Sequence, residues 1–245
     1  MRSLFTVIIA AALVVGCAKD PSKDAAAAKV EDPTPAAGEA APDPNADGAP
    51  KAAGDPKAEA PATPTENKEP TARKVIDLTG QISFVGSKVS GSHSGLFKEW
   101  TGGILLGDSL EAARLTFEVK TASVHSDFEE RTKWSGKLDD HLKNEDFFDT
   151  EKFPTASFTS SRIAPQTQGT TTHIVTGDLT MKGIKKTVTF PATISLTDTE
   201  FSAKAEFTIN RKDWGLTWNA ALETGGVLVS DKIKLEFDIS AIRNA

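Results

Sequence analysis

The sequence predicts an all-β domain: an antiparallel barrel or sandwich of about eight strands, interrupted by one short helical insert. Two observations lead to this prediction. Apolar and polar residues alternate in a series of short runs after residue 73, as in strands that bury one face. One stretch, residues 134–148, breaks the alternation and is crowded with charge. Because parallel strands would be apolar on both faces, the one-sided pattern favours antiparallel pairing.

An export signal precedes the domain. Arg2 supplies a positive charge, residues 4–15 are almost entirely apolar, and Gly16 and Cys17 follow. The apolar run is too short to cross a bilayer, so it is typical of a cleaved signal. Residues 14–17 resemble the lipobox of bacterial lipoproteins, which predicts a lipoprotein signal peptide over residues 1–17 and a lipid anchor on Cys17. The alternative is an ordinary signal peptide in which the single cysteine falls by chance.

Residues 18–72 are expected to be a disordered linker. They contain 10 of the 13 prolines and 17 alanines, and Val30 is their one β-branched aliphatic residue. Such a segment cannot bury enough apolar surface to offset its chain entropy. As a flexible coil it would extend on the order of 40 Å, so we expect a tether that lifts the domain off a membrane. Ala18, rather than aspartate, follows Cys17, which favours anchoring in the outer membrane, facing the periplasm.

The folded part is expected to span residues 73–245 as one domain. Its positive and negative charges nearly balance and form no basic stripe, so nucleic acid is not expected as a partner. Leu115, Phe117 and Val119 illustrate the alternation, with polar residues between them. The strands expected from this pattern are residues 75–79, 82–89, 110–121, 155–163, 173–181, 185–197, 201–209 and 229–239.

The helical insert precedes the fourth of these strands. Leu142, Phe147 and Phe148 lie among charged residues at spacings that favour a short helix or helical loop. Phe153-Pro154 ends it, because the residue before a proline is pushed out of the helical region. The sequence therefore predicts a charged cap that runs directly into a strand.

Four stretches of this domain together resemble the YceI-like family of exported bacterial proteins. They are 139–142 with 146–149 and Phe153-Pro154, then 176–184, 210–216, and 95–97 with 102–104. The resemblance implies a lipocalin-like, antiparallel eight-stranded β-barrel that binds a polyisoprenoid or similar lipid in the cell envelope, as a carrier or store. Two positions depart from the family pattern: Leu138 stands where an arginine is usual, and Lys88 where a histidine is common.

A barrel of about eight strands is either filled by its own side chains or holds one ligand, and a lining and a core look the same in a sequence. The resemblance favours a lipid ligand. The side chains expected to line its site are Phe84, Leu115, Phe117, Phe158, Val188, Phe190, Phe207, Leu235 and Phe237. His141, Arg211 and Trp214 are candidates for a headgroup site at the rim, since arginine pairs well with phosphate. The alternative for Arg211 is an ion pair with a neighbouring acid, with Trp214 closing the barrel.

The sequence predicts no catalytic chemistry. Asp139, His141, Asp146 and Asp149 could suggest a metal site, but their spacing fits no metal motif. A structural role, capping the helix and tying it to the barrel, is favoured instead. No nucleophile or phosphate-binding motif is present, and no cofactor is expected beyond the bound lipid. Two other functions stay open: an accessory redox or enzymatic role on an isoprenoid such as a quinone, and a ligand-free stress or interaction module. A homodimer also stays open.

Overall fold

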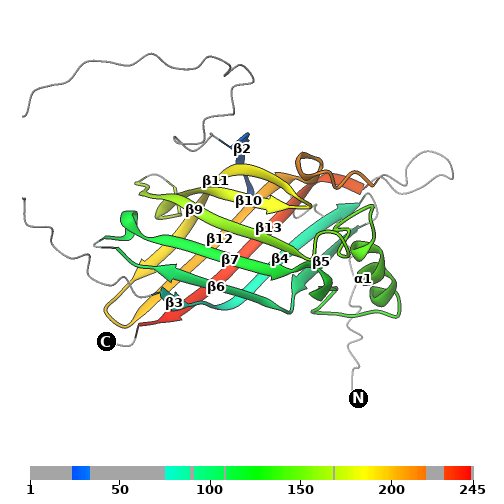
Figure 1. Cartoon of the computed structure of the whole chain (residues 1–245), viewed down its shortest axis with the longest axis horizontal. Coiled ribbons are helices and arrows are strands. Elements are labelled where there is room, and N and C mark those ends of the chain that lie inside the picture. The colour runs from blue at the N-terminus through cyan, green and yellow to red at the C-terminus, as the bar shows by residue number, and fades with distance from the viewer. Residues whose placement is uncertain are drawn as a thin grey trace, which may run out of the picture.

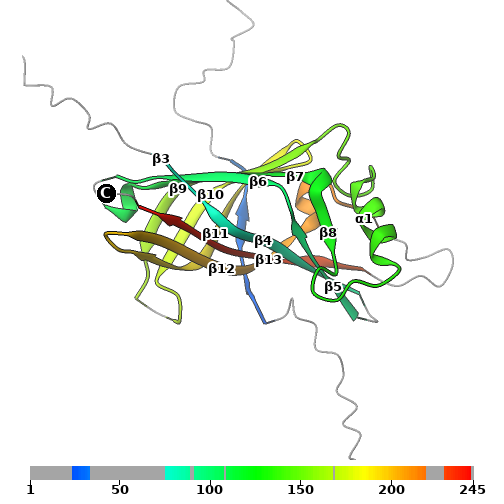
Figure 2. The same ribbon diagram turned by 90° about the horizontal axis from the view of Figure 1, so that it is seen from below.

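The structure, a computed structural model, describes residues 24–33, 75–88, 91–107, 109–167, 169–218 and 229–243. Within these ranges, thirteen strands form one curled sheet, and a single α-helix lies at one end of it (Figures 1 and 2). This confirms the expected lipocalin-like, mainly antiparallel β architecture with one short helical insert. The expected strand count was wrong: the described residues contain thirteen strands, not eight.

The strands are β1 (Ala26–Ala27), β2 (Lys29–Glu31), β3 (Val75–Asp77), β4 (Thr79–Lys88), β5 (Gly91–Phe97), β6 (Trp100–Leu105), β7 (Arg114–Lys120), β8 (Val124–Ser126), β9 (Thr155–Pro165), β10 (His173–Met181), β11 (Ile184–Leu196), β12 (Glu200–Asn210) and β13 (Val229–Ile242). The helix α1 is Ser135–Lys143, and three 3-10 helices, η2 (Leu110–Ala112), η3 (Thr121–Ser123) and η4 (Arg211–Trp214), join strands. The additional strands escaped the sequence pattern because they are short or, like β5, rich in glycine and serine.

The sheet closes on itself around the core. The main strand order is β3-β6-β7-β9-β10-β11-β12-β13-β4-β5-β8. Only Leu78 separates β3, which pairs with β6, from β4, which pairs with β13, so the two sides of the sheet meet there. The Leu78 amide donates to the Gly102 carbonyl oxygen at 2.9 Å and secures this corner.

Alternation along the strands places the apolar side chains inside. On β7, Leu115, Phe117 and Val119 are buried, whereas Thr116 and Glu118 are exposed. The same period of two runs along β10, β11 and β12. Burial on one face only is the expected result for an antiparallel sheet with a solvated outer surface. No helix in the described part of the chain has the length and apolar character required to span a bilayer.

Residues 24–33 belong to the barrel wall, although they lie inside the segment expected to be a disordered linker. β1 pairs with β12 in parallel, and β2 pairs with β11 in antiparallel orientation. Val30 packs against the core, and this one apolar β-branched residue supplies burial that the composition of the whole segment did not indicate. The rest of residues 18–72, and the signal peptide with Cys17, lie outside the described residues.

Candidate functional site

A cavity of about 410 Å³ lies at the end of the barrel that carries α1. Strands β4 and β13 contribute much of its wall, and the cap, defined as residues 134–148, covers it. Its apolar lining consists of Ile82, Phe84, Phe97, Phe117, Val119, Leu138, Leu142, Phe147, Phe148, Ala156, Leu179, Met181, Ile209, Leu216, Trp218, Val229, Ile233, Leu235 and Phe237. The size falls within the roughly 300–1,000 Å³ typical of small-molecule sites.

Four of the nine side chains expected to line a ligand site line this cavity: Phe84, Phe117, Leu235 and Phe237. The other five are buried but lie outside the cavity lining; they are Leu115, Phe158, Val188, Phe190 and Phe207. These five point inward as their strands predict, yet they fill the other part of the barrel. The barrel is therefore part packed core and part cavity.

An aromatic cluster separates the two parts. Phe117 stacks on Phe158 with ring centroids 5.2 Å apart, and its ring lies 5.0 Å from that of Phe237. Phe190 and Phe207 stack below them at 4.0 Å. Gly177 makes room for this packing, because a Cβ there would lie 2.5 Å from the Phe158 ring. Phe117 and Phe237 thus form the cavity floor, and the remaining phenylalanines support it.

The cap closes the opposite side with apolar side chains. Leu138 and Leu142 on α1 face the cavity together with Phe147 and Phe148 from the loop that follows. Trp218 packs edge-on against His141, with ring centroids 4.7 Å apart. Leu138, His141 and Leu142 lie three and four residues apart, and this spacing in the sequence places them on one face of the helix.

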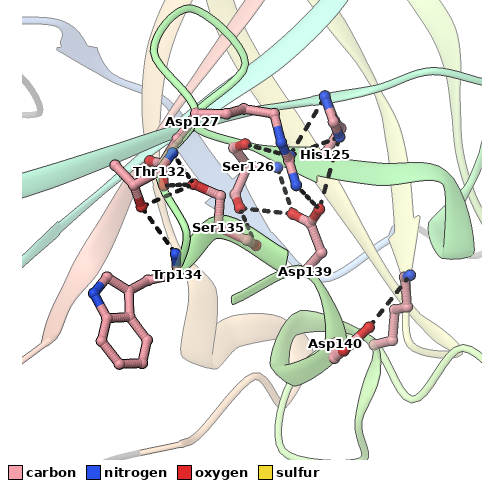
Figure 3. A network of polar contacts seen from close by, with 10 residues as sticks. His125, Ser126, Asp127, Thr132, Trp134, Ser135, Asp139 and Asp140 are labelled. Atoms are coloured by element: carbon pink, nitrogen blue, oxygen red, sulfur yellow. Dashed lines mark hydrogen bonds and ion pairs between the residues drawn. The ribbon is translucent and has the colours of Figure 1, made fainter. Parts of the chain in front are cut away.

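A network of hydrogen bonds ties α1 to β8 (Figure 3). The Asp139 carboxylate accepts from both the backbone amide and the hydroxyl of Ser126, each at 2.6 Å, and from Arg131 at 3.0 Å. Burial of Asp139 opposes its ionisation, but these bonds outweigh burial and hold its pKa below the ordinary value. Ser135 at the start of α1 donates to Asp127 at 2.8 Å. The cap is thus attached to the wall by a charged and mostly buried cluster.

Two histidines contact this cluster, and one of them, His93, also lines the cavity. His93 lines the cavity, and its Nδ1 lies 2.9 Å from Asp127. His125 Nδ1 lies 2.8 Å from an Arg131 nitrogen; since arginine only donates, this His125 nitrogen accepts. Burial, with Lys98 and Arg131 nearby, lowers the pKa of His125. Its neutral ring therefore helps to orient the arginine that holds Asp139.

Asp139 acts as the tie to the barrel that the sequence suggested, but it does not cap the helix: Trp134 occupies the N-cap position and makes no side-chain capping bond. His141 lies 3.8 Å from Asp146, and Asp149 pairs with Lys152 at 3.2 Å. Among the described residues, no group of three or more histidine, cysteine or acidic side chains is arranged to hold a metal ion.

Arg211 and Trp214 hold the strand-end corner formed by η4. The Arg211 guanidinium is buried and donates to the carbonyl oxygens of Ser230 and Leu216 and to Asp231. Burial lowers the pKa of Arg211, and Asp231 partly offsets the effect. Trp214 is fully buried and donates from Nε1 to the Leu179 carbonyl oxygen at 3.0 Å. Arg211 also borders the cavity, whereas Trp214 does not.

Polar groups at the cavity include residues that the sequence did not single out. Lys88 and His93 come from the β4–β5 hairpin, and they line the cavity together with His141 and Arg211. All four side chains are basic. The irregular sequence of β5 gave no signal for His93, and Lys88 was noted only as a departure from the family pattern. The cavity thus combines apolar walls with basic groups.

A family model described as YceI-like domain matches residues 75–241. A UPF0312 protein of Pseudomonas putida is 38% identical over 125 residues, covering 49% of this chain and 60% of that protein. A UPF0312 protein of Pseudomonas fluorescens is 34% identical over 154 residues, covering 58% of this chain and 74% of the relative. The sequence match thus spans less than two thirds of the Pseudomonas putida protein.

Solved structures show the same fold. Burkholderia cenocepacia BcnA is similar with a TM-score of 0.55 and 25% identity, over 66% of this chain and 95% of BcnA. A polyisoprenoid binding domain from Saccharophagus degradans is similar with a TM-score of 0.51 and 16% identity, over 70% of this chain and 100% of that domain. At this identity the second likeness shows the fold alone.

Proposed function

Because this chain belongs to the family of YceI-like domain proteins, we propose that it binds one apolar lipid chain in the cavity beneath the cap and carries or stores it in the cell envelope. The apolar walls of the 410 Å³ cavity are the observation that carries this proposal. Burial of apolar surface contributes about 25 cal/mol per Å², so an extended hydrocarbon gains affinity there without specific hydrogen bonds. The polyisoprenoid binding domain with the same fold suggests an isoprenoid tail.

The aromatic floor limits how much of the tail enters. Phe117 and Phe237 close the cavity below, and the stacked rings beneath them leave the other part of the barrel filled. A tail longer than the cavity must protrude at the cap or displace these rings. We therefore propose one short tail, or the end of a long one, as the buried part of the ligand. A polar head would lie near Lys88, His93 and His141, whose side chains supply donors.

The proposal includes the N-terminal anchor. Cys17, placed in a lipobox-like sequence, would carry acyl chains and hold the domain at the outer membrane, facing the periplasm. No catalytic step is proposed, since the cavity offers burial and a few polar contacts.

Mass spectrometry of an organic extract of the purified protein tests the binding function. We expect one class of apolar lipid at close to one molecule per chain. Ala156→Phe should lower that occupancy, because Ala156 lines the cavity and a phenyl ring there takes ligand space. Thr159→Phe is the matched control, since Thr159 is exposed on the same strand. An extract without lipid from the wild-type protein, or equal occupancy in both variants, would contradict the proposal.

A further inference from the structure

The barrel wall splits between β11 and β12. These strands pair with each other only where Ala192–Leu196 of β11 faces Phe201–Ala205 of β12. Beyond that point, Thr187–Thr189 of β11 pairs with β2, and Phe207–Thr208 of β12 pairs with β1. Residues 26–31 therefore lie in a wedge between the two strands, which Figure 2 shows as the blue segment crossing the wall. We call residues 24–33 the wall strand.

Backbone and side-chain contacts both hold the wall strand in the wedge. The Ala28 amide donates to the Thr208 carbonyl oxygen at 2.9 Å. Val30 lies opposite Val188, whose side chain is fully buried, and packs against the core. Lys186 reaches Asp32 at 2.5 Å on the outside. Without the wall strand, the facing backbone groups of β11 and β12 would lose these partners, and Val188 would lose part of its cover.

The wall strand also fixes where the N-terminal anchor can lie. Cys17 is seven positions before Asp24. Seven residues span at most about 25 Å when fully extended. We propose that the wall strand clamps the barrel to the membrane by its β11–β12 side. This side then faces the lipid surface, and the domain does not rotate freely about its anchor. This inference rests on the lipid anchor at Cys17 proposed above.

The clamp changes the role of the segment that follows. Residues 34–74 connect two segments that are both docked in the sheet, β2 and β3. Their length therefore does not set the distance between the barrel and the membrane. The tether is the short stretch from Cys17 to Asp24, rather than all the residues up to Ala72.

Hydrogen–deuterium exchange tests the wall strand in the soluble chain from Ala18 to Ala245. Ala28→Pro removes the donor that bonds to Thr208. We expect peptides covering Ile184–Leu196 and Glu200–Asn210 to exchange on the order of tenfold faster in this variant. Ala52→Pro is the control, because it also adds a proline but places it in the segment 34–74, outside the wall strand. It should leave the exchange of both peptides unchanged. Unchanged exchange of both peptides in Ala28→Pro would overturn the wall strand as a lasting part of the barrel.

Fluorescence quenching tests the orientation in the full lipidated chain. The protein is placed in vesicles of phosphatidylethanolamine and phosphatidylglycerol that carry a nitroxide on the headgroup. A dye is attached at Thr193→Cys on β11 or at Glu118→Cys on β7; both positions are exposed, and β7 lies three strands from β11 in the sheet order. We expect quenching at Thr193 to exceed that at Glu118 by about twofold, given the short reach of the tether, and Ala28→Pro to reduce the difference.

The outcomes separate the two proposals. Equal quenching at both positions in a vesicle-bound protein overturns the clamp and leaves the anchor standing. If the chain does not associate with vesicles, the lipid anchor at Cys17 is contradicted, and the proposed membrane orientation is overturned with it. The hydrogen–deuterium exchange experiment still tests whether the wall strand is part of the barrel.

Discussion

Phe190 and Phe207 support the cavity floor that Phe117 and Phe237 form. Their rings stack at 4.0 Å with an interplanar angle of 11°, and both side chains are almost fully buried. Phe190→Ala should destabilise the fold by about 3–5 kcal/mol, because it removes a buried ring and leaves a void. The same void should let longer lipid tails enter. Urea unfolding measures the first effect, and mass spectrometry of retained lipids measures the second.

Val75→Ala serves as the control for this substitution, because Val75 is exposed. Its effect on stability should stay within about 0.5 kcal/mol. A loss of less than about 1 kcal/mol in Phe190→Ala would show that the cluster is not a packed floor.

Asp139 gives the cap a defined pH dependence. Its pKa is lowered in the folded state, so its ionised form contributes stability that is present above the unfolded value of about 3.9 and is lost as pH falls through the folded value. Asp139→Asn should lower stability at pH 7 and flatten the stability profile in the acid range below about pH 4. Thermal unfolding across pH checks this. Asp140→Asn, one residue along and highly exposed, should keep the wild-type profile.

At the residue scale, the sequence predicts which side chains point inward but not what they meet. Leu115 and Phe117 share one face of β7, two residues apart, yet only Phe117 lines the cavity. Alternation reports the face of a strand, whereas position along the barrel axis depends on strand tilt and register. His93 and Lys88 could not be assigned to the cavity for a related reason, since they reach it through a hairpin whose sequence has no clear period.

At the element scale, the wall strand should contribute to stability. Deleting residues 18–33 from the soluble chain should cost about 2 kcal/mol or more, from lost burial of Val30 and lost backbone bonds. For a domain of this size that loss corresponds to a fall in Tm of about 4–8 °C. Differential scanning calorimetry measures it. Scrambling residues 34–72 at constant composition is the control and should leave Tm unchanged; equal Tm values for all three chains would argue against the pairing of β1 and β2.

Elements with a long apolar face could be predicted, and short ones could not. The strands from β9 to β13 and the helical insert follow directly from spacing. The expected end of the helix at Phe153-Pro154 was wrong, because α1 ends at Lys143; Pro154 lies directly before β9 instead. β1 and β2 could not be found in this way, because an alanine-rich segment with one valine has no pattern of its own. Their conformation is imposed by the unpaired backbone of the wedge, which is a property of the tertiary structure.

At the scale of the whole molecule, the proposed anchor at Cys17 predicts in which membrane fraction the protein is found. Cys17→Ser should move the protein from the membrane fraction to the soluble periplasmic fraction, because the acyl chains are lost. Ala18→Asp should keep the lipid but shift the protein from outer to inner membrane fractions. Density-gradient fractionation with immunodetection distinguishes these results. Retention of Cys17→Ser in the membrane pellet would exclude Cys17 as the anchor.

The pairing of β1 with β12 also determines when the barrel can be completed. Ala26 and Phe207 are partners although they lie about 180 residues apart in the chain, and contacts of such sequence separation form late because loop closure must come first. A chain that is synthesised from its N-terminus presents residues 24–33 first and their partner strand almost last. We therefore expect the wedge between β11 and β12 to stay an open edge through most of folding. The pairing of residues 24–33 with this edge is then the expected last step of folding.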